Sequence, residues 1–98
     1  MDFIISIKNG PNGNLVVVTD KNIIGKIFEE GKLQLDLTKD FYKGIEKTEE
    51  EIKEIFKKAQ HIHLTGEKSV ALGIELSLIN QDKILFVSGV PHAEMVLG

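Results

Sequence analysis

The fold of this chain depends most on residues 61–87, which read HIHLTGEKSVALGIELSLINQDKILFV. Residues 61–64 predict a short strand, and a helix is expected to begin at residue 65 or 66 and to extend to about residue 78. Residues 84–87 follow as a continuous apolar strand. A strand, a helix and a second strand in so short a stretch predict a compact parallel crossover, which is right-handed in nearly all proteins.

The segments before this stretch predict further strands and one short helix. Residues 3–8 and 15–19 are rich in Ile and Val and are separated by Asn, Gly and Pro, so they predict a β-hairpin. Asp20 is expected to cap a short helix that ends near Phe28. Residues 33–37 alternate Leu with polar residues, which is typical of a half-exposed strand.

A capping box at Thr48 is the clearest local signal in the sequence. The Thr48 side chain is expected to accept from the backbone of Glu51, and the Glu51 side chain to accept in return from the backbone of Thr48. The helix that follows is amphipathic, and its predicted buried stripe consists of Ile52, Ile55, Phe56 and Ala59.

These elements predict one mixed α/β domain over residues 1–98. In chain order it has an N-terminal β-hairpin, a short helix and strand, an amphipathic helix, and a C-terminal strand–helix–strand crossover with a final edge strand. The composition agrees with a folded domain, because 42% of the residues are hydrophobic and 28% are charged with a net charge of only −3.

Several function classes are disfavoured by composition. The absence of Cys excludes disulfides, thiolate nucleophiles and Cys-based metal centres. No signal peptide or long apolar run is present, so we expect a cytoplasmic protein without membrane contact. All 12 basic residues are Lys, and without the planar fork of Arg a dedicated reader of duplex bases is disfavoured. A local patch of Lys remains compatible with RNA contact.

Four stretches together resemble the archaeal domain-of-unknown-function family 424, over nearly the whole chain. They are Ile24–Gly31, Phe41–Gly44, Leu64–Lys68 and Gly89–Ala93, of which the last is the most specific. Three positions depart from the family pattern: His63 replaces a usual Asn, Ile45 a usual acid and Glu94 a common Gln. The resemblance implies a small archaeal cytoplasmic protein whose biochemical role is unassigned and whose family is loosely linked with translation, and it supplies no catalytic residues.

Two histidines on one predicted strand are the candidate metal ligands. His61 and His63 are two residues apart, so both rings project from one face of the strand. His92 is a candidate third ligand, with Glu94 or Glu67 as an oxygen donor. Because the family usually has Asn at position 63, the pair is not part of the shared pattern, and we expect no metal site and no cofactor.

The turn from the strand at 61–64 into the next helix is a candidate anion site. Thr65, Gly66 and Lys68 lie where free backbone N–H groups and the helix dipole attract anions. The turn lacks the first glycine of a phosphate-binding loop, so nucleotide hydrolysis is not expected. The alternative is structural: Thr65 caps the helix, Gly66 turns the chain and Lys68 is solvated.

The segment from Gly89 to His92 is the strongest functional candidate. Pro91 restricts the residue before it and therefore presents the His92 imidazole on a rigid turn. A positioned imidazole binds ligands or transfers protons, whereas the structural alternative is a ring bonded to a backbone carbonyl that locks the C-terminal strand.

A second candidate lies in the loop at Phe41, Tyr42 and Lys43. One of these rings is expected to anchor the loop on the core, and the other is free to stack on a base or on a protein.

From these residues we expect a non-enzymatic binding module that serves RNA or the translation apparatus, and we assign no catalytic residues. One alternative is a small enzyme, or an anion- or ligand-binding protein, that uses His92 and the helix start at Gly66. Another is a protein–protein adaptor, or a homodimer, that docks through an open strand edge. No specific small molecule is indicated.

Overall fold

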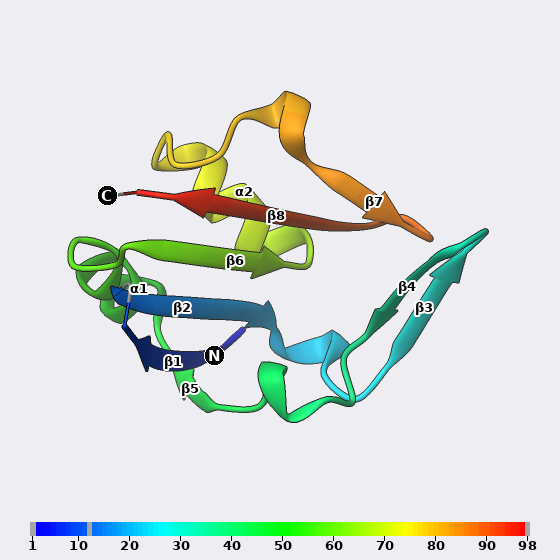
Figure 1. Cartoon of the computed structure of the whole chain (residues 1–98), viewed down its shortest axis with the longest axis horizontal. Coiled ribbons are helices and arrows are strands. Elements are labelled where there is room, and N and C mark those ends of the chain that lie inside the picture. Colours follow the sequence, from blue (N-terminus) through cyan, green and yellow to red (C-terminus); the bar gives the residue numbers. More distant parts are fainter. Residues whose placement is uncertain (1, 12, 98) are drawn as a thin grey trace.

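The computed structural model describes residues 2–11 and 13–97, and its centre is a six-stranded sheet (Figure 1). In spatial order the strands are β5 (Ile45–Lys47), β1 (Phe3–Gly10), β2 (Gly13–Asp20), β6 (His61–Thr65), β8 (Val90–Val96) and β7 (Leu85–Val87). The pair β2–β6 is parallel, and the other neighbouring pairs are antiparallel. This sheet with its helices confirms the predicted mixed α/β class.

The predicted N-terminal hairpin is confirmed. β1 and β2 pair in register from Phe3 opposite Asp20 to Gly10 opposite Gly13. The side chains of Val16, Val17 and Val18 are buried on both faces of the sheet, because β2 lies between β1 and β6 and both faces are covered at this point. A run of β-branched residues therefore marks a central strand, as it does in other two-sided sheets.

The predicted helix from Asp20 to Phe28 is wrong. Only one 3₁₀ turn, η1 (Lys21–Ile23), forms after β2, and a hairpin of β3 (Ile27–Glu30) and β4 (Leu33–Asp36) follows. Gly25 has a φ of +86° and donates its N–H to the carbonyl of Leu37, which extends the hairpin. A backbone with that φ cannot continue a helix, so the apolar residues follow strand geometry instead. The strand predicted at 33–37 is confirmed by β4.

The capping box of α1 (Glu49–Phe56) is confirmed. The Thr48 hydroxyl accepts from the N–H of Glu51 at 3.2 Å, and the Glu51 carboxylate accepts from the N–H of Thr48 at 3.1 Å. Ile52 and Phe56 are buried on the sheet, as the amphipathic pattern predicts. The loop before α1 contains a 3₁₀ turn, η2 (Asp40–Tyr42), and the short strand β5, which was not predicted.

The C-terminal crossover forms with an insertion that the sequence pattern does not reveal. β6, α2 (Glu67–Glu75), η3 (Gln81–Lys83) and β7 follow one another, and β6 and β7 run parallel because both pair antiparallel with β8. β8 therefore lies between them, and the predicted final edge strand is an interior strand, with β7 at the edge. Ser88 and Gly89 both have positive φ, which is the turn geometry that reverses the chain from β7 into β8.

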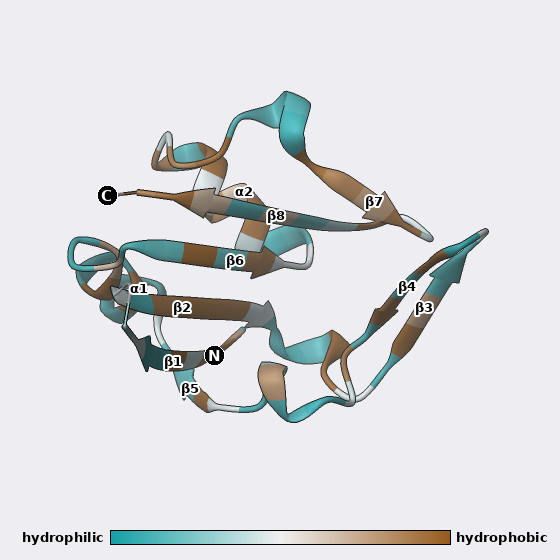
Figure 2. Ribbon diagram, viewed as in Figure 1, coloured by the Kyte–Doolittle hydropathy of each residue, from teal (hydrophilic) through white to brown (hydrophobic). Residues whose placement is uncertain are grey.

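The two faces of the sheet are covered differently. Both α-helices lie on one face, which we call the helix face, behind the sheet in Figure 1, and their apolar side chains close the main core with those of β1, β2, β6 and β8. The opposite face, the open face, is partly covered by η2 and by the β3–β4 hairpin, which form a second small core around Leu35, Leu37 and Val87. Figure 2 shows the hydrophobic strand β2 in the middle of the sheet, with hydrophilic stretches on β6 and β8 beside it.

No helix within residues 2–11 and 13–97 is both long enough and apolar enough to cross a membrane.

Candidate functional site

Four side chains from β6 and β8 converge on the open face, and we call them the imidazole cluster: His63, Thr65, His92 and Glu94. The antiparallel register places His63 opposite Glu94 and Thr65 opposite His92. Directly opposite residues project from the same face of a sheet, and residues two apart on one strand do the same. Strand alternation and register alone therefore bring all four together.

The cluster is linked by short contacts. Nε2 of His63 lies 2.9 Å from Oε1 of Glu94, and Nε2 of His92 lies 3.9 Å from the same oxygen. A hydrogen bond of 2.7 Å joins Nδ1 of His92 to the hydroxyl of Thr65, which is completely buried. The hydrogen bond to Thr65 thus fixes the orientation of the His92 ring, with Nε2 on the side of Glu94.

Burial controls the protonation of both imidazoles. It lowers the pKa of His63 and of His92 below the ordinary value for histidine, and this effect exceeds the opposing attraction of the Glu94 carboxylate. Each ring is also disfavoured as a cation by a neighbouring imidazole, His61 for His63 and His63 for His92. At neutral pH the contact between His63 and Glu94 is therefore a hydrogen bond from a neutral ring, rather than an ion pair.

Aromatic rings of η2 extend the cluster across the open face. The ring of Phe41 lies 5.4 Å from that of His63, which lies 5.7 Å from that of His92, measured between centroids. Tyr42 packs edge-on against Phe41 at 5.1 Å, and Nζ of Lys8 lies 5.1 Å from the centre of the Phe41 ring. Burial, with smaller contributions from Glu94 and Asp36, raises the pKa of Tyr42. The result is a continuous row of a cation and three rings, Lys8–Phe41–His63–His92.

The start of α2 does hold an anion, but the chain supplies it. The carboxylate of Asp20, which is 4% exposed, accepts from the N–H groups of Lys68 at 3.0 Å and Ser69 at 2.8 Å, and from the Ser69 hydroxyl at 2.7 Å. A Cβ on Gly66 would lie 2.3 Å from Cγ of Asp20. The turn thus has the chemistry that its sequence predicts, but an external anion would have to displace Asp20.

The predicted residues around this helix start form a second, separate location. Gly66, Lys68, Gly89 and Pro91 line a cavity of about 220 Å³ at the end of the sheet, together with Asp20. Gly66 donates its N–H to the carbonyl of Pro91 at 2.9 Å, which joins the turn to β8. Pro91 and Gly89 therefore have structural roles, in this hydrogen bond and in the turn into β8.

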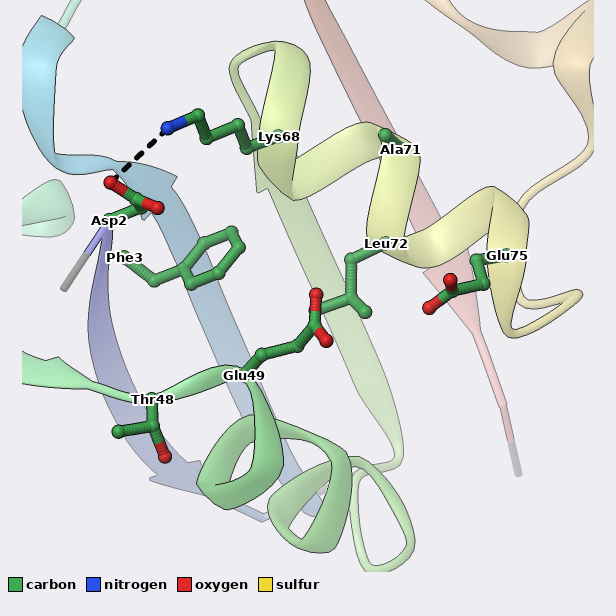
Figure 3. A pocket seen from close by; sticks show the side chains of 8 residues that line it. All are labelled: Asp2, Phe3, Thr48, Glu49, Lys68, Ala71, Leu72 and Glu75. Carbon is green, nitrogen blue, oxygen red and sulfur yellow. Dashed lines mark ion pairs between the residues drawn. The ribbon is translucent and has the colours of Figure 1, made fainter.

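The Lys68 side chain contacts a different cavity from the one at the helix start. Its ammonium pairs with Asp2 at 3.2 Å across a cavity of about 500 Å³ between α2 and the start of α1 (Figure 3). Figure 3 also shows the carboxylates of Glu49 and Glu75 at this cavity, so its charged groups are predominantly acidic. This surface does not favour phosphate.

The remaining predicted residues lie at the margins of the cluster. His61 is on the open face, two residues before His63 on β6 and opposite Val96. It lines a cavity of about 570 Å³ together with His63 and Glu94. Lys43 is exposed and pairs with Asp40 at 3.1 Å. Glu67 lies at the start of α2, away from the imidazole cluster.

Two residues, Asp20 and Lys8, have roles in the structure that the sequence analysis does not predict. Asp20 was expected to cap a helix directly after it, but it caps α2 instead, 48 residues further along at Lys68. Its position at the end of a run of buried Val was the available signal, because a buried carboxylate requires partners. Lys8 had no local signal, since its neighbour Phe41 comes from a distant loop.

Comparisons with known proteins agree with the sequence resemblance. The family model described as "Protein of unknown function (DUF424)" matches residues 7–97, and no curated protein matches the chain. A crystal structure described as an uncharacterized conserved protein from Methanopyrus kandleri is similar, with a TM-score of 0.78 and 20% sequence identity over 95% of this chain and 89% of that chain. That likeness establishes a shared fold. With the family model covering nearly all of its sequence, this chain belongs to the DUF424 family, as its four quoted stretches predict.

Proposed function

We propose that this protein is a non-enzymatic module that binds single-stranded RNA on the open face of its sheet. The observation that carries the proposal is the row Lys8–Phe41–His63–His92, in which neighbouring groups are 5.1–5.7 Å apart. Proteins that bind single strands commonly combine rings on an exposed sheet with cations that follow the phosphates.

The electrostatics of the face predict weak binding with a modest dependence on salt. Lys8 supplies one positive charge, whereas Glu94 opposes it at the other end of the row. Stacking on Phe41 and on the neutral imidazoles would then provide most of the affinity, and phosphate contacts the remainder. Modest preference for base identity follows, because every base has a face that stacks.

The alternatives from the sequence receive less support. An enzyme that uses His92 together with the helix start at Gly66 needs both groups at one site. The His92 ring, however, belongs to the imidazole cluster, and the N–H groups at the helix start donate to Asp20. For an adaptor that accepts a strand, the two edge strands of the six-stranded sheet, β5 and β7, are each only three residues long. Short edges offer few backbone groups for pairing.

The test is fluorescence anisotropy with labelled oligouridine and oligoadenosine, at low and at physiological salt. We expect Phe41→Ala to weaken binding about 5- to 150-fold, the equivalent of losing one stacked base. Phe86→Ala is the matched control, because Phe86 is 55% exposed on β7 and lies outside the row. Lys8→Gln should reduce the salt slope by about 0.7, and Lys57→Gln, at the C-cap of α1, should leave it unchanged.

Two results would refute the proposal: no binding of either RNA at low salt, or an equal loss of affinity in Phe41→Ala and Phe86→Ala. Circular dichroism of each variant shows whether a loss of binding reflects a loss of fold. If the oligonucleotides bind, cosedimentation with archaeal ribosomal particles at low salt tests the association with translation.

A further inference from the structure

We propose that His63, His92 and Glu94 form a binding site for a divalent transition-metal ion of the zinc class. One nitrogen of each imidazole and one carboxylate oxygen lie within 4.8 Å of one another, on the same face of two paired strands. Two imidazoles and a carboxylate are a donor set that zinc and its neighbours in the first transition series prefer. The site goes beyond RNA binding, because it needs no nucleic acid to form.

The distances fit a metal ion with small side-chain movements. A tetrahedral ion with bonds of about 2.0–2.2 Å requires donors roughly 3.3–3.6 Å apart. The two measured separations, 2.9 Å from Glu94 to His63 and 3.9 Å from Glu94 to His92, lie on either side of this range. The Glu94 side chain is 60% exposed and is therefore free to adjust, whereas the two imidazoles are held on adjacent strands.

Thr65 provides the support that metal-binding histidines usually have. In known sites the second ring nitrogen is hydrogen-bonded, which fixes the orientation of the ring and leaves the first nitrogen toward the ion. Nδ1 of His92 is bonded to the buried Thr65 hydroxyl at 2.7 Å, and Nε2 faces Glu94.

The donor set also predicts selectivity. Two nitrogen donors suit Zn²⁺, whereas Mg²⁺ and Ca²⁺ prefer oxygen donors in larger numbers. Three protein ligands leave at least one coordination position of a tetrahedral ion open. A bound ion would change the formal charge of Glu94 and the ion together from −1 to +1, next to the row proposed for RNA.

The test uses the full chain without a histidine tag. Zn²⁺ is titrated at neutral pH by isothermal calorimetry, with Mg²⁺ in a parallel titration, and the three imidazoles are observed by ¹⁵N NMR. We expect one Zn²⁺ per chain, with shifts of the His63 and His92 ring signals and little change at His61. Mg²⁺ should produce neither heat nor shifts at the same concentration.

The variants compare ligands with a neighbour on the same strand. Glu94→Gln and His63→Ala should each weaken Zn²⁺ binding by at least about 10-fold, and Thr65→Val by about 10- to 100-fold. His61→Ala is the matched control and should bind as the parent does, because His61 lies outside the group of donors that are within 4.8 Å. Glu94 is exposed, so Glu94→Gln should keep its fold and tests the site even if the substitution of a more buried residue unfolds the chain.

The inference is overturned if Zn²⁺ does not bind, if His61→Ala loses as much affinity as His63→Ala, or if Mg²⁺ competes equally. These outcomes are separate from those of the RNA experiment. Zn²⁺ binding without RNA binding would refute only the proposed function, and RNA binding without Zn²⁺ binding would refute only this site.

Discussion

On β6, alternate residues enter two different environments. Ile62 and Leu64 are completely buried on the helix face, whereas His61 and His63, on the same strand, are partly exposed on the open face. The helix face is closed by two α-helices and holds an aliphatic core, and the open face is only partly covered and holds the titratable groups of the imidazole cluster. One strand thus stabilises the fold with one set of side chains and presents chemistry with the other.

Substitutions on the helix face should lower the free energy of unfolding more than substitutions on the open face. A side chain on the helix face contributes by burial, so its removal leaves a cavity in a packed core. A side chain on the open face contributes through hydrogen bonds and partial exposure, so its removal mainly changes what the surface can bind. Stability and function should therefore separate by face, even between adjacent residues.

The largest contrast should come from Leu64→Ala against His63→Ala. Leu64 is 0% exposed and packs closely on Gly73, so its truncation should lower the free energy of unfolding by about 2–5 kcal/mol. His63→Ala should lower it by less than about 1 kcal/mol, since the ring is near the surface. Urea unfolding followed by circular dichroism measures both, and equal losses would contradict the separation by face.

Asp20→Ala removes the hydrogen bonds that join the end of β2 to the start of α2 on the helix face. The carboxylate accepts three hydrogen bonds at the start of α2, and its removal should cost about 2–3 kcal/mol because buried donors lose a charged acceptor. Asp82→Ala is the control, since Asp82 is exposed on η3, and its effect should stay within about 0.5 kcal/mol. A loss in Asp20→Ala as small as that of the control would show that the cap is unimportant.

Two buried threonines refine the comparison within the open face. Thr19 and Thr65 are opposite each other on β2 and β6, but only Thr65 is bonded to His92, and the Thr19 hydroxyl has no partner among the described residues. Thr65→Val should lose about 1 kcal/mol, whereas Thr19→Val should be neutral or stabilising by up to about 1 kcal/mol. Thermal unfolding of the two variants side by side distinguishes them, and the opposite order would refute the assignment.

Thr48→Ala removes the N-cap of α1, the other helix on the helix face. Loss of the cap of α1 should lower stability by about 1 kcal/mol, without altering the imidazole cluster. Thr48→Ser keeps the hydroxyl and should retain most of the stability. Urea unfolding gives the change, and unaltered Zn²⁺ binding in Thr48→Ala would show that the two faces are independent.

The smallest expected effect is a dependence on pH that comes from the same capping box. Hydrogen bonds from the backbone and side chain of Thr48, with Lys47, lower the pKa of the Glu51 carboxyl in the folded chain. A lowered folded pKa adds stability above the unfolded pKa, and this contribution disappears as pH falls through the folded pKa. Acid titrations of stability should therefore be less steep for Glu51→Gln than for the parent, and identical slopes would contradict the pKa direction.

Local signals predicted the elements that depend on near neighbours. The capping box at Thr48 and the hairpin of residues 3–8 with 15–19 need only contacts within short segments, and both are confirmed. The helix expected after Asp20 failed because the apolar residues up to Phe28 fit a hairpin as well as a helix, and Gly25 with the partner strand at Leu37 decided between them.

The candidate site was predictable in part. The alternation of His61 and His63 on one face follows from strand geometry, and His92 was a candidate from its position after Pro91. The sequence indicates Glu94 and Glu67 equally as an oxygen donor, and only the strand register, which pairs Glu94 with His63, separates the two. The rings of Phe41 and Tyr42 reach the same face because η2 folds over β1 and β2, which no local pattern indicates.

The sequence by itself determined which residues are apolar on each strand, where α1 and α2 begin, and which side chains carry chemistry. The tertiary structure decided that β8 inserts between β6 and β7, which places Thr65 beside His92 from 27 residues away, and that Asp20 caps a helix 48 residues beyond it. The physical reason is that periodicity and capping are local, whereas strand order depends on burial and hydrogen bonding across the whole chain.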